Sequence, residues 1–200
     1  MARQIQQGLP ADLFMSADES LVLQLAGTGR TRQLASGPDQ GALYALGRLA
    51  LVAPSDSKLP LDAKLSGVGE QWPQIGKFAI ANPDHAPYGR AAQQALQALG
   101  LWDRAQTRVV LGESIAQATQ YITTGAAQAG ITALSLAQAP ELKGQLRYLA
   151  LPESLHAPLR QRMVLLAGAS PAAADFYRYL QQAPARATLA RYGFSAPPSP

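Results

Sequence analysis

The residues best suited to binding chemistry lie in one loop, residues 82–90, which reads NPDHAPYGR. The apolar run from Phe78 to Ala81 before it is typical of a strand, and the pattern after it is helical. In an open α/β sheet, ligands bind beyond the carboxyl ends of the strands, at turns of this kind. The N–H groups of a first helical turn attract an anion, and the Tyr88 hydroxyl adds a neutral donor. The loop therefore predicts a site for a small oxyanion held without a salt bridge.

The same loop also fits a purely structural interpretation, a tight turn in which Tyr88 packs against the next strand. A second strand end of this kind follows at residues 130–135, which read GITALS. Its backbone N–H groups and Thr132 are candidates for the same cleft. Taken alone, this second segment carries little information about a ligand.

Catalytic and metal-binding alternatives find little support in the residue types. His85 beside Asp84 suggests a base and the carboxylate that orients it, but no nucleophile motif such as GxSxG is present. The only other histidine is His156, and no HExxH or comparable metal spacing occurs. The chain has no cysteine, which excludes disulfides and thiolate sites. We therefore expect no enzyme, no cofactor and no metal held directly by side chains, and we interpret His85 as a loop histidine.

Composition indicates a globular protein rather than a nucleic-acid binder. Hydrophobic residues make up 48% of the 200 residues and charged residues 15%, and the net charge is +4. The basic residues stand singly along the chain, whereas a nucleic-acid binder clusters them. No apolar stretch approaches the length of a membrane span, and the opening MARQIQQ lacks the apolar segment of an export signal. By itself, the sequence predicts a protein that stays in the cytoplasm.

Strand-like and helix-like segments alternate along the chain. Apolar runs predict strands at 13–15, 43–53, 78–81, 108–111, 130–134, 146–151 and 163–167. Helical spacing and capping residues such as Asp18 and Ser170 predict helices at 2–8, 18–25, 88–100, 113–124, 170–182 and from there to Tyr192. This alternation is typical of an α/β fold with mostly parallel sheets. We expect a boundary near Gly76 and Lys77, and a return crossing between residues 151 and 163.

Several segments, in matching order, resemble the periplasmic molybdate-binding proteins of bacterial ABC importers. They are ARQI at 2–5, PADLFMSAD at 10–18, NPDHAPYGRAA at 82–92, LGLWD at 99–103, VLGESIAQA at 110–118 and RYGF at 191–194. The resemblance covers almost the whole chain. It implies a two-lobed periplasmic-binding fold, with residues 1–76 and 160–200 in the first lobe and 77–159 in the second. It also implies a hinge motion that closes the lobes on an oxyanion.

The resemblance also implies a function and a set of site residues. Molybdate or tungstate is the expected ligand, an ABC importer permease the expected partner, and the periplasm the expected location of a monomer. Tyr88 matches a family position that touches the oxyanion, and Thr132 matches one that acts through its backbone N–H. Gln161 falls near the ligand on the return strand. Gly89 and Arg90 flank Tyr88 as possible amide donors.

The start of the chain departs from the family pattern. Family members have a strand, a helix and a second strand before the helix that contains ARQI, and two turns there supply hydroxyl donors. Met1 lies within that helix, so we expect a first lobe without its first strand, its first helix and those donors. The open alternatives are a cytosolic oxyanion-sensing or interaction protein on the same fold, or a non-functional fragment.

Overall fold

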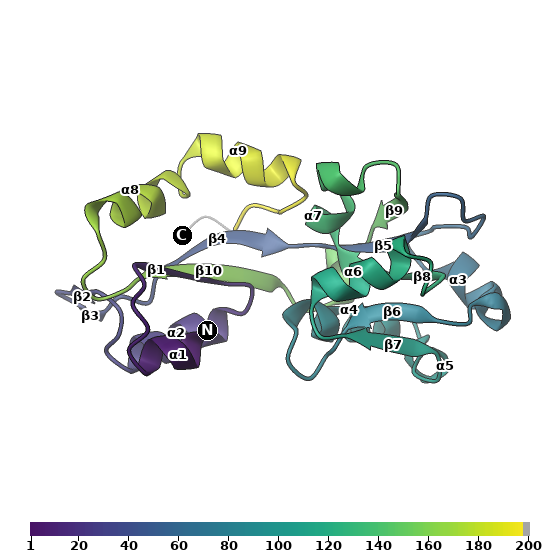
Figure 1. Ribbon diagram of the computed structural model, residues 1–200, viewed down its shortest axis with the longest axis horizontal. Coiled ribbons are helices and arrows are strands. Elements are labelled where there is room, and N and C mark those ends of the chain that lie inside the picture. The colour runs from purple at the N-terminus through teal and green to yellow at the C-terminus, as the bar shows by residue number, and fades with distance from the viewer. Residues whose placement is uncertain (198–200) are drawn as a thin grey trace. The chain divides into compact units, whose positions relative to one another are not determined.

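The computed structural model describes residues 1–197, and the chain folds into two compact units. Unit 1 comprises Met1–Gly47 and the chain from Arg160 onward, and unit 2 comprises Arg48–Leu159 (Figure 1). The first crossing thus lies between Gly47 and Arg48, well before the predicted boundary at Gly76 and Lys77. The reason is that residues 49–54 form a strand in the sheet of unit 2, so their neighbours in space lie there.

Unit 2 is built on a mixed sheet of five strands in the order β7-β6-β8-β5-β9. The strands are β5 Leu49–Pro54, β6 Phe78–Ala81, β7 Val109–Gly112, β8 Ala129–Ala133 and β9 Leu146–Ala150. Strand β6 runs parallel to β7 and β8, whereas β5 runs antiparallel to β8 and β9. The α/β class is therefore confirmed, but the mostly parallel sheet that was expected is a mixed one. Apolar runs indicate buried strands without indicating their direction.

Two longer helices cover the centre of this sheet. Unit 2 contains α3 Ser66–Glu70, α4 Pro87–Ala98, α5 Trp102–Ala105, α6 Ile115–Thr123 and α7 Leu134–Ala137, with short 3-10 helices η1 Trp72–Gln74, η2 Pro140–Leu142 and η3 Glu153–Leu155. Helix α4 connects β6 to β7, and α6 connects β7 to β8 on the other side of β6. Right-handed crossovers in opposite directions place the two helices on opposite faces. Helix α6 contributes Ile122 to a core that also holds Val52 and Ala79.

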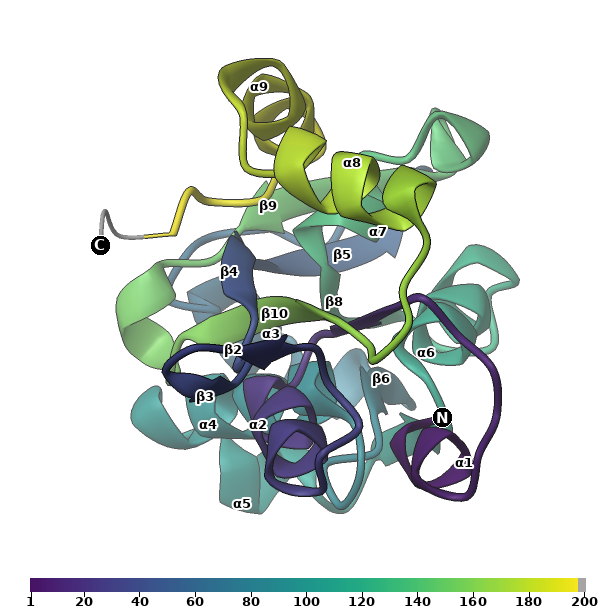
Figure 2. The same ribbon diagram turned by 90° about the vertical axis from the view of Figure 1, so that its left-hand side faces the viewer.

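Unit 1 is a three-stranded sheet with helices on both sides. Its strands are β1 Leu13–Ser16, β4 Ala42–Gly47 and β10 Leu159–Leu165, in the order β1-β10-β4, and β1 is antiparallel to β10. A small hairpin is formed by β2 Gln33–Leu34 and β3 Gly37–Pro38. Helices α1 Ala2–Gln6 and α2 Glu19–Gly27 lie on one side of the sheet, and α8 Pro171–Tyr179 and α9 Ala183–Arg191 on the other (Figures 1 and 2).

Capping residues in the sequence correctly predicted where two of the helices begin. The Asp18 side chain accepts from Ser20 N at 3.0 Å at the start of α2, and Ser170 Oγ accepts from Ala173 N at 3.3 Å at the start of α8, which confirms both caps. The predicted single strand over residues 43–53 is wrong, because Arg48 separates β4 from β5. Among the described residues, no helix is long and apolar enough to cross a membrane.

Candidate functional site

Three parallel strands of unit 2 end at the same edge of its sheet. Strands β6, β7 and β8 each lead directly or through a short loop into a helix, α4, α6 and α7 respectively. Strands β7 and β8 lie on opposite sides of β6, so the connections through α4 and α6 run in opposite directions across the sheet and a switch point lies at β6. Strands β6 and β8 pair from Phe78 opposite Ala129 to Ala79 opposite Gly130, and both strands continue beyond this pair. Such a switch point is where open α/β sheets bind ligands.

The loop between β6 and α4 is held rigidly against the end of β7. Asn82 N donates to Gly112 O at 2.8 Å, and the Asn82 side chain accepts from Asp84 N at 3.0 Å. Helix α4 then begins at Pro87, and Gly89 sits against the end of β6. A Cβ atom at Gly89 would overlap the carbonyl oxygen of Ala81, so only glycine permits this close approach.

Tyr88 lies in the first turn of α4 and is 7% exposed. The backbone amides of Gly89 and Arg90, which were predicted to donate to a ligand, donate within the helix instead. Gly89 N and Arg90 N both donate to the carbonyl oxygen of Ala86 at 3.0 Å. In this structure neither amide is therefore left for a ligand, and the expected role of Gly89 and Arg90 as amide donors is corrected. Gly89 contributes through its lack of a side chain instead.

The start of α6 is a second source of donors, which the sequence analysis did not identify as part of the site. Ser114 caps the helix by accepting from Gln117 N at 3.2 Å. The backbone N–H groups of Ile115 and Ala116 form no hydrogen bond among residues 1–197. With the positive end of the helix dipole, these two amides suit an anion. The signal was available, since a serine follows the predicted strand 108–111 just as the 82–90 loop follows its strand.

His85 joins the two loops rather than forming a catalytic pair. Its Nε2 lies 3.0 Å from Glu113 O and 3.4 Å from Glu113 Oε2. A carbonyl oxygen can only accept, so Nε2 carries the hydrogen in this contact. The ring is exposed, and its partner is Glu113 rather than the adjacent Asp84. The contact ties the β6–α4 loop to the β7–α6 loop, which is a structural role.

Thr132 is fully buried, and both of its donors point into the protein. Its hydroxyl contacts that of Thr119 on α6, and Thr119 in turn donates to Ile115 O at 2.8 Å. Thr132 lies opposite Ala50 in the antiparallel ladder, and Leu134 N donates to Arg48 O two residues away. Hydrogen-bonded pairs alternate in such a ladder, so the Thr132 N–H is directed at β5. The structure therefore corrects the expectation that this amide faces a ligand.

Gln161 belongs to unit 1, on strand β10, and is 5% exposed. Its Oε1 accepts from the Tyr44 hydroxyl on β4 at 2.9 Å. Burial raises the pKa of Tyr44 to about 12, so this hydroxyl stays protonated and remains a donor at physiological pH. Gln161 and Tyr88 lie in different units.

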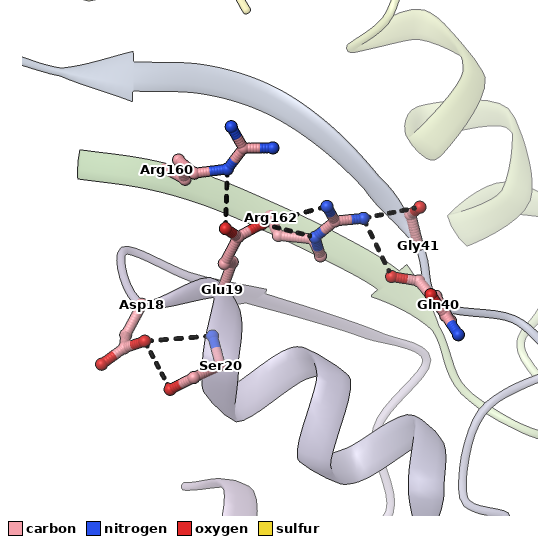
Figure 3. Close-up of polar contacts among 7 residues, drawn as sticks. All are labelled: Asp18, Glu19, Ser20, Gln40, Gly41, Arg160 and Arg162. Atoms are coloured by element: carbon pink, nitrogen blue, oxygen red, sulfur yellow. Dashed lines mark hydrogen bonds and ion pairs between the residues drawn. The ribbon is translucent and has the colours of Figure 1, made fainter. Parts of the chain in front are cut away.

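Two arginines flank Gln161 on the opposite face of β10, and Glu19 at the start of α2 binds both of them (Figure 3). Glu19 Oε1 lies 2.6 Å from Arg160 Nε, and Glu19 Oε2 lies 3.0 Å from Arg162 Nη2. Arg162 also donates to the carbonyls of Gln40 and Gly41, at 3.3 and 3.2 Å. These contacts hold β10 against α2 and the loop before β4, and they fix the strand that carries Gln161.

A separate pocket of about 250 Å³ lies beside the β6–α4 loop in unit 2. Its lining includes Asp84, Gln93, Trp102, Gln106 and Leu111, and none of its lining residues is basic. An acidic side chain without a compensating cation makes this pocket unsuited to an oxyanion. No group of three or more metal-ligating side chains that could hold a metal ion occurs within residues 1–197.

Comparison with known proteins identifies the family. The family model for bacterial extracellular solute-binding proteins matches residues 1–195. The molybdate-binding protein ModA of Azotobacter vinelandii is 35% identical over 96% of this chain and 73% of its own length. The corresponding protein of Escherichia coli is 32% identical over 98% of this chain and 74% of its own.

Solved structures agree with the sequence relatives. The periplasmic molybdate-binding protein of Azotobacter vinelandii superimposes with a TM-score of 0.82 at 29% identity, covering 98% of this chain and 83% of that one. The sulfate-binding protein SubI of Mycobacterium tuberculosis has a TM-score of 0.73 at 16% identity, covering 98% and 72%, which shows a shared fold alone. The chain therefore belongs to the bacterial extracellular solute-binding proteins and, within them, to the family of the molybdate-binding proteins.

Proposed function

We propose that this chain binds molybdate, and tungstate as its close chemical analogue, as the substrate-binding component of an ABC importer in the periplasm. Its role in that case is to carry the oxyanion to the membrane permease. The relationship of the whole chain to molybdate-binding proteins supports the ligand class. Solute-binding proteins bind and release their ligand without converting it, so we expect no turnover. We further expect the chain to act as a monomer.

The observation that carries this proposal is the set of neutral donors at the carboxyl edge of the unit 2 sheet. Tyr88 in the first turn of α4 and the amides of Ile115 and Ala116 in the first turn of α6 can each donate to an oxygen of a tetrahedral dianion. Two of these donors belong to the backbone and the third is carried by a buried ring, so binding orders little mobile side chain. They also allow size discrimination, because a smaller ion would leave buried donors unpaired.

Substitution of Tyr88 by phenylalanine tests this assignment. Phenylalanine keeps the packing of this buried ring and removes only the hydroxyl. A hydrogen bond to a charged group contributes about 1.5–3 kcal/mol, so we expect Tyr88→Phe to weaken molybdate binding by about 10- to 100-fold. Isothermal titration calorimetry measures the affinity. Tyr148→Phe, which alters an exposed tyrosine on β9 of the same unit, is the matched control.

The possible outcomes are distinct. Equal molybdate affinities of the wild type and Tyr88→Phe would remove Tyr88 from the site. A wild-type chain that gives no binding heat with either molybdate or tungstate would contradict the proposed function itself. Titration with sulfate on the same sample measures the selectivity.

A further inference from the structure

Two threonine hydroxyls form a buried chain between strand β8 and helix α6. Thr132 near the end of β8 is 0% exposed and Thr119 in α6 is 3% exposed. The hydroxyls contact each other, and Thr119 Oγ1 lies 2.8 Å from the carbonyl oxygen of Ile115, the first residue of α6. Apolar residues such as Ile122 surround this part of the sheet face. Burial of a hydroxyl in apolar surroundings costs free energy unless the hydroxyl forms a hydrogen bond.

The direction of donation in this chain follows from the chemistry of the groups. The carbonyl oxygen of Ile115 can only accept, so the single hydroxyl hydrogen of Thr119 is directed to it. Thr119 then has no hydrogen left for its partner and can only accept from Thr132. The chain therefore runs from Thr132 to Thr119 to Ile115. It links the end of β8 to the first turn of α6, whose amides of Ile115 and Ala116 belong to the candidate site.

Other contacts between α6 and β8 constrain the helix less specifically. Gly130 gives room for Ile122, since a Cβ atom at Gly130 would lie 2.7 Å from Ile122 Cδ1. Such apolar packing is not directional, and Ile122 lies near the far end of α6 from the candidate site. The hydroxyl chain instead holds α6 at Thr119, one turn after Ile115, and the bond from Thr119 to the Ile115 carbonyl lies within the helix. It is a directional contact close to the helix start.

We propose that Thr132 and Thr119 are positioning residues that set the size of the oxyanion site by fixing the first turn of α6. This inference rests on the proposed oxyanion binding and assigns Thr132 a role other than that of a ligand. With the chain intact, the amides of Ile115 and Ala116 stay at a spacing suited to the larger molybdate ion. Without it, the first turn can move toward a smaller ion, and discrimination against sulfate decreases.

The test is the ratio of molybdate to sulfate affinity in Thr132→Val, measured by calorimetry. Valine preserves the branched shape and removes the donor, and Thr119 can still bond to Ile115. We expect the ratio to fall about three- to tenfold, and Thr132→Ser, which keeps the hydroxyl, to restore it. A purely structural role would weaken the binding of both anions alike and leave the ratio unchanged. Thr132→Ala is the second variant if the valine variant does not fold.

The matched control is Thr124→Val at the other end of α6. Thr124 Oγ1 makes the same type of bond, to Gln120 O at 2.8 Å, but it is exposed and follows the end of the helix. Its removal is expected to leave the ratio unaltered. A wild type that discriminates, together with an unchanged ratio in Thr132→Val and Thr132→Ala, overturns this inference alone. A wild type that binds neither anion overturns the proposed function and this inference together.

Discussion

At the scale of single residues, hydrogen bonds from backbone N–H groups hold the Asp62 side chain in place. Asp62 accepts from the N–H groups of Lys64 and Ser66, both at 3.0 Å, and of Gly67 at 2.8 Å. The turn they close contains Leu65 in the left-handed region, with φ of 55°. Hydrogen bonds from the backbone, with Gly67 first, lower the pKa of the Asp62 carboxyl below its ordinary value of 3.8. The charged carboxylate thus stabilises the entry to α3.

Replacement of Asp62 by alanine should lower the free energy of unfolding of the protein at pH 7. The expected loss is about 1 kcal/mol, as for the removal of a side-chain cap. Because the folded pKa is depressed, this stabilisation is present above the unfolded pKa and is lost as the pH falls through the folded pKa. Urea unfolding at pH 7 and at a pH well below 3.8, where the folded carboxyl is protonated as well, measures both effects. Asp56→Ala, at an exposed aspartate in the same unit, is the control, and a difference that persists at low pH would contradict the assignment.

The same scale shows what the sequence could reveal of the site. The loop of residues 82–90 was identified because two prolines and a tyrosine follow a buried strand and begin a helix. Thr132 was chosen for its place at a strand end, but its hydroxyl is directed at Thr119, which lies thirteen residues away in sequence and on another element. The amides at the start of α6 were missed because Ser114 resembles any N-cap. Only the sheet order brings that helix start to the same edge as Tyr88.

At the scale of elements, the start of α4 makes a close backbone contact with the end of β6. Gly89 lets the first turn of the helix press against the end of β6, with Ala81 as its neighbour. This contact fixes where Tyr88 sits relative to the carboxyl edge of the sheet. Helix α4 also buries Ala91, Ala92, Ala95 and Leu96, so its small residues allow a close approach along its length.

Introduction of a methyl group at Gly89 should therefore displace the start of α4. Overpacking of this kind costs about 1–3 kcal/mol, and we expect Gly89→Ala to lower the free energy of unfolding by this amount and to weaken molybdate binding. Gly27→Ala is the matched control, because nothing lies within 4 Å of a Cβ atom there and its φ is not in the left-handed region. Urea unfolding measures the stability of both variants, and calorimetric titration measures their affinity for molybdate. Wild-type stability and affinity in Gly89→Ala would show that the helix start is not constrained.

Apolar patterns in the sequence do not reveal which sheet a strand joins or in which direction it runs. The apolar residues 43–53 correctly indicated strand structure, but the pattern alone does not reveal that Arg48 divides the run between two sheets. The mixed direction of the unit 2 sheet was missed for a related reason. Strand β5 is buried along its length and pairs with β8 and β9 on both sides, and such a strand has the same apolar composition in either direction.

At the scale of the whole molecule, the chain consists of two units, each with its own sheet and core, and it crosses between them after Gly47 and after Leu159. An arginine follows each crossing and is paired within its own unit. Arg48 Nε lies 3.1 Å from Glu153 Oε1 in unit 2, and Arg160 pairs with Glu19 in unit 1. The two connecting strands are therefore anchored where they enter each unit.

The central claim is that the folded chain binds molybdate, and thermal unfolding with and without the ion tests it most directly. A ligand that binds only the native state adds about 2.7 kcal/mol of stability at a hundredfold excess over Kd. For a chain of this size that corresponds to a rise in Tm of about 5–10 °C. We predict such a rise with molybdate and a much smaller one with equal sulfate. A cooperative transition whose Tm does not move with molybdate would contradict the account.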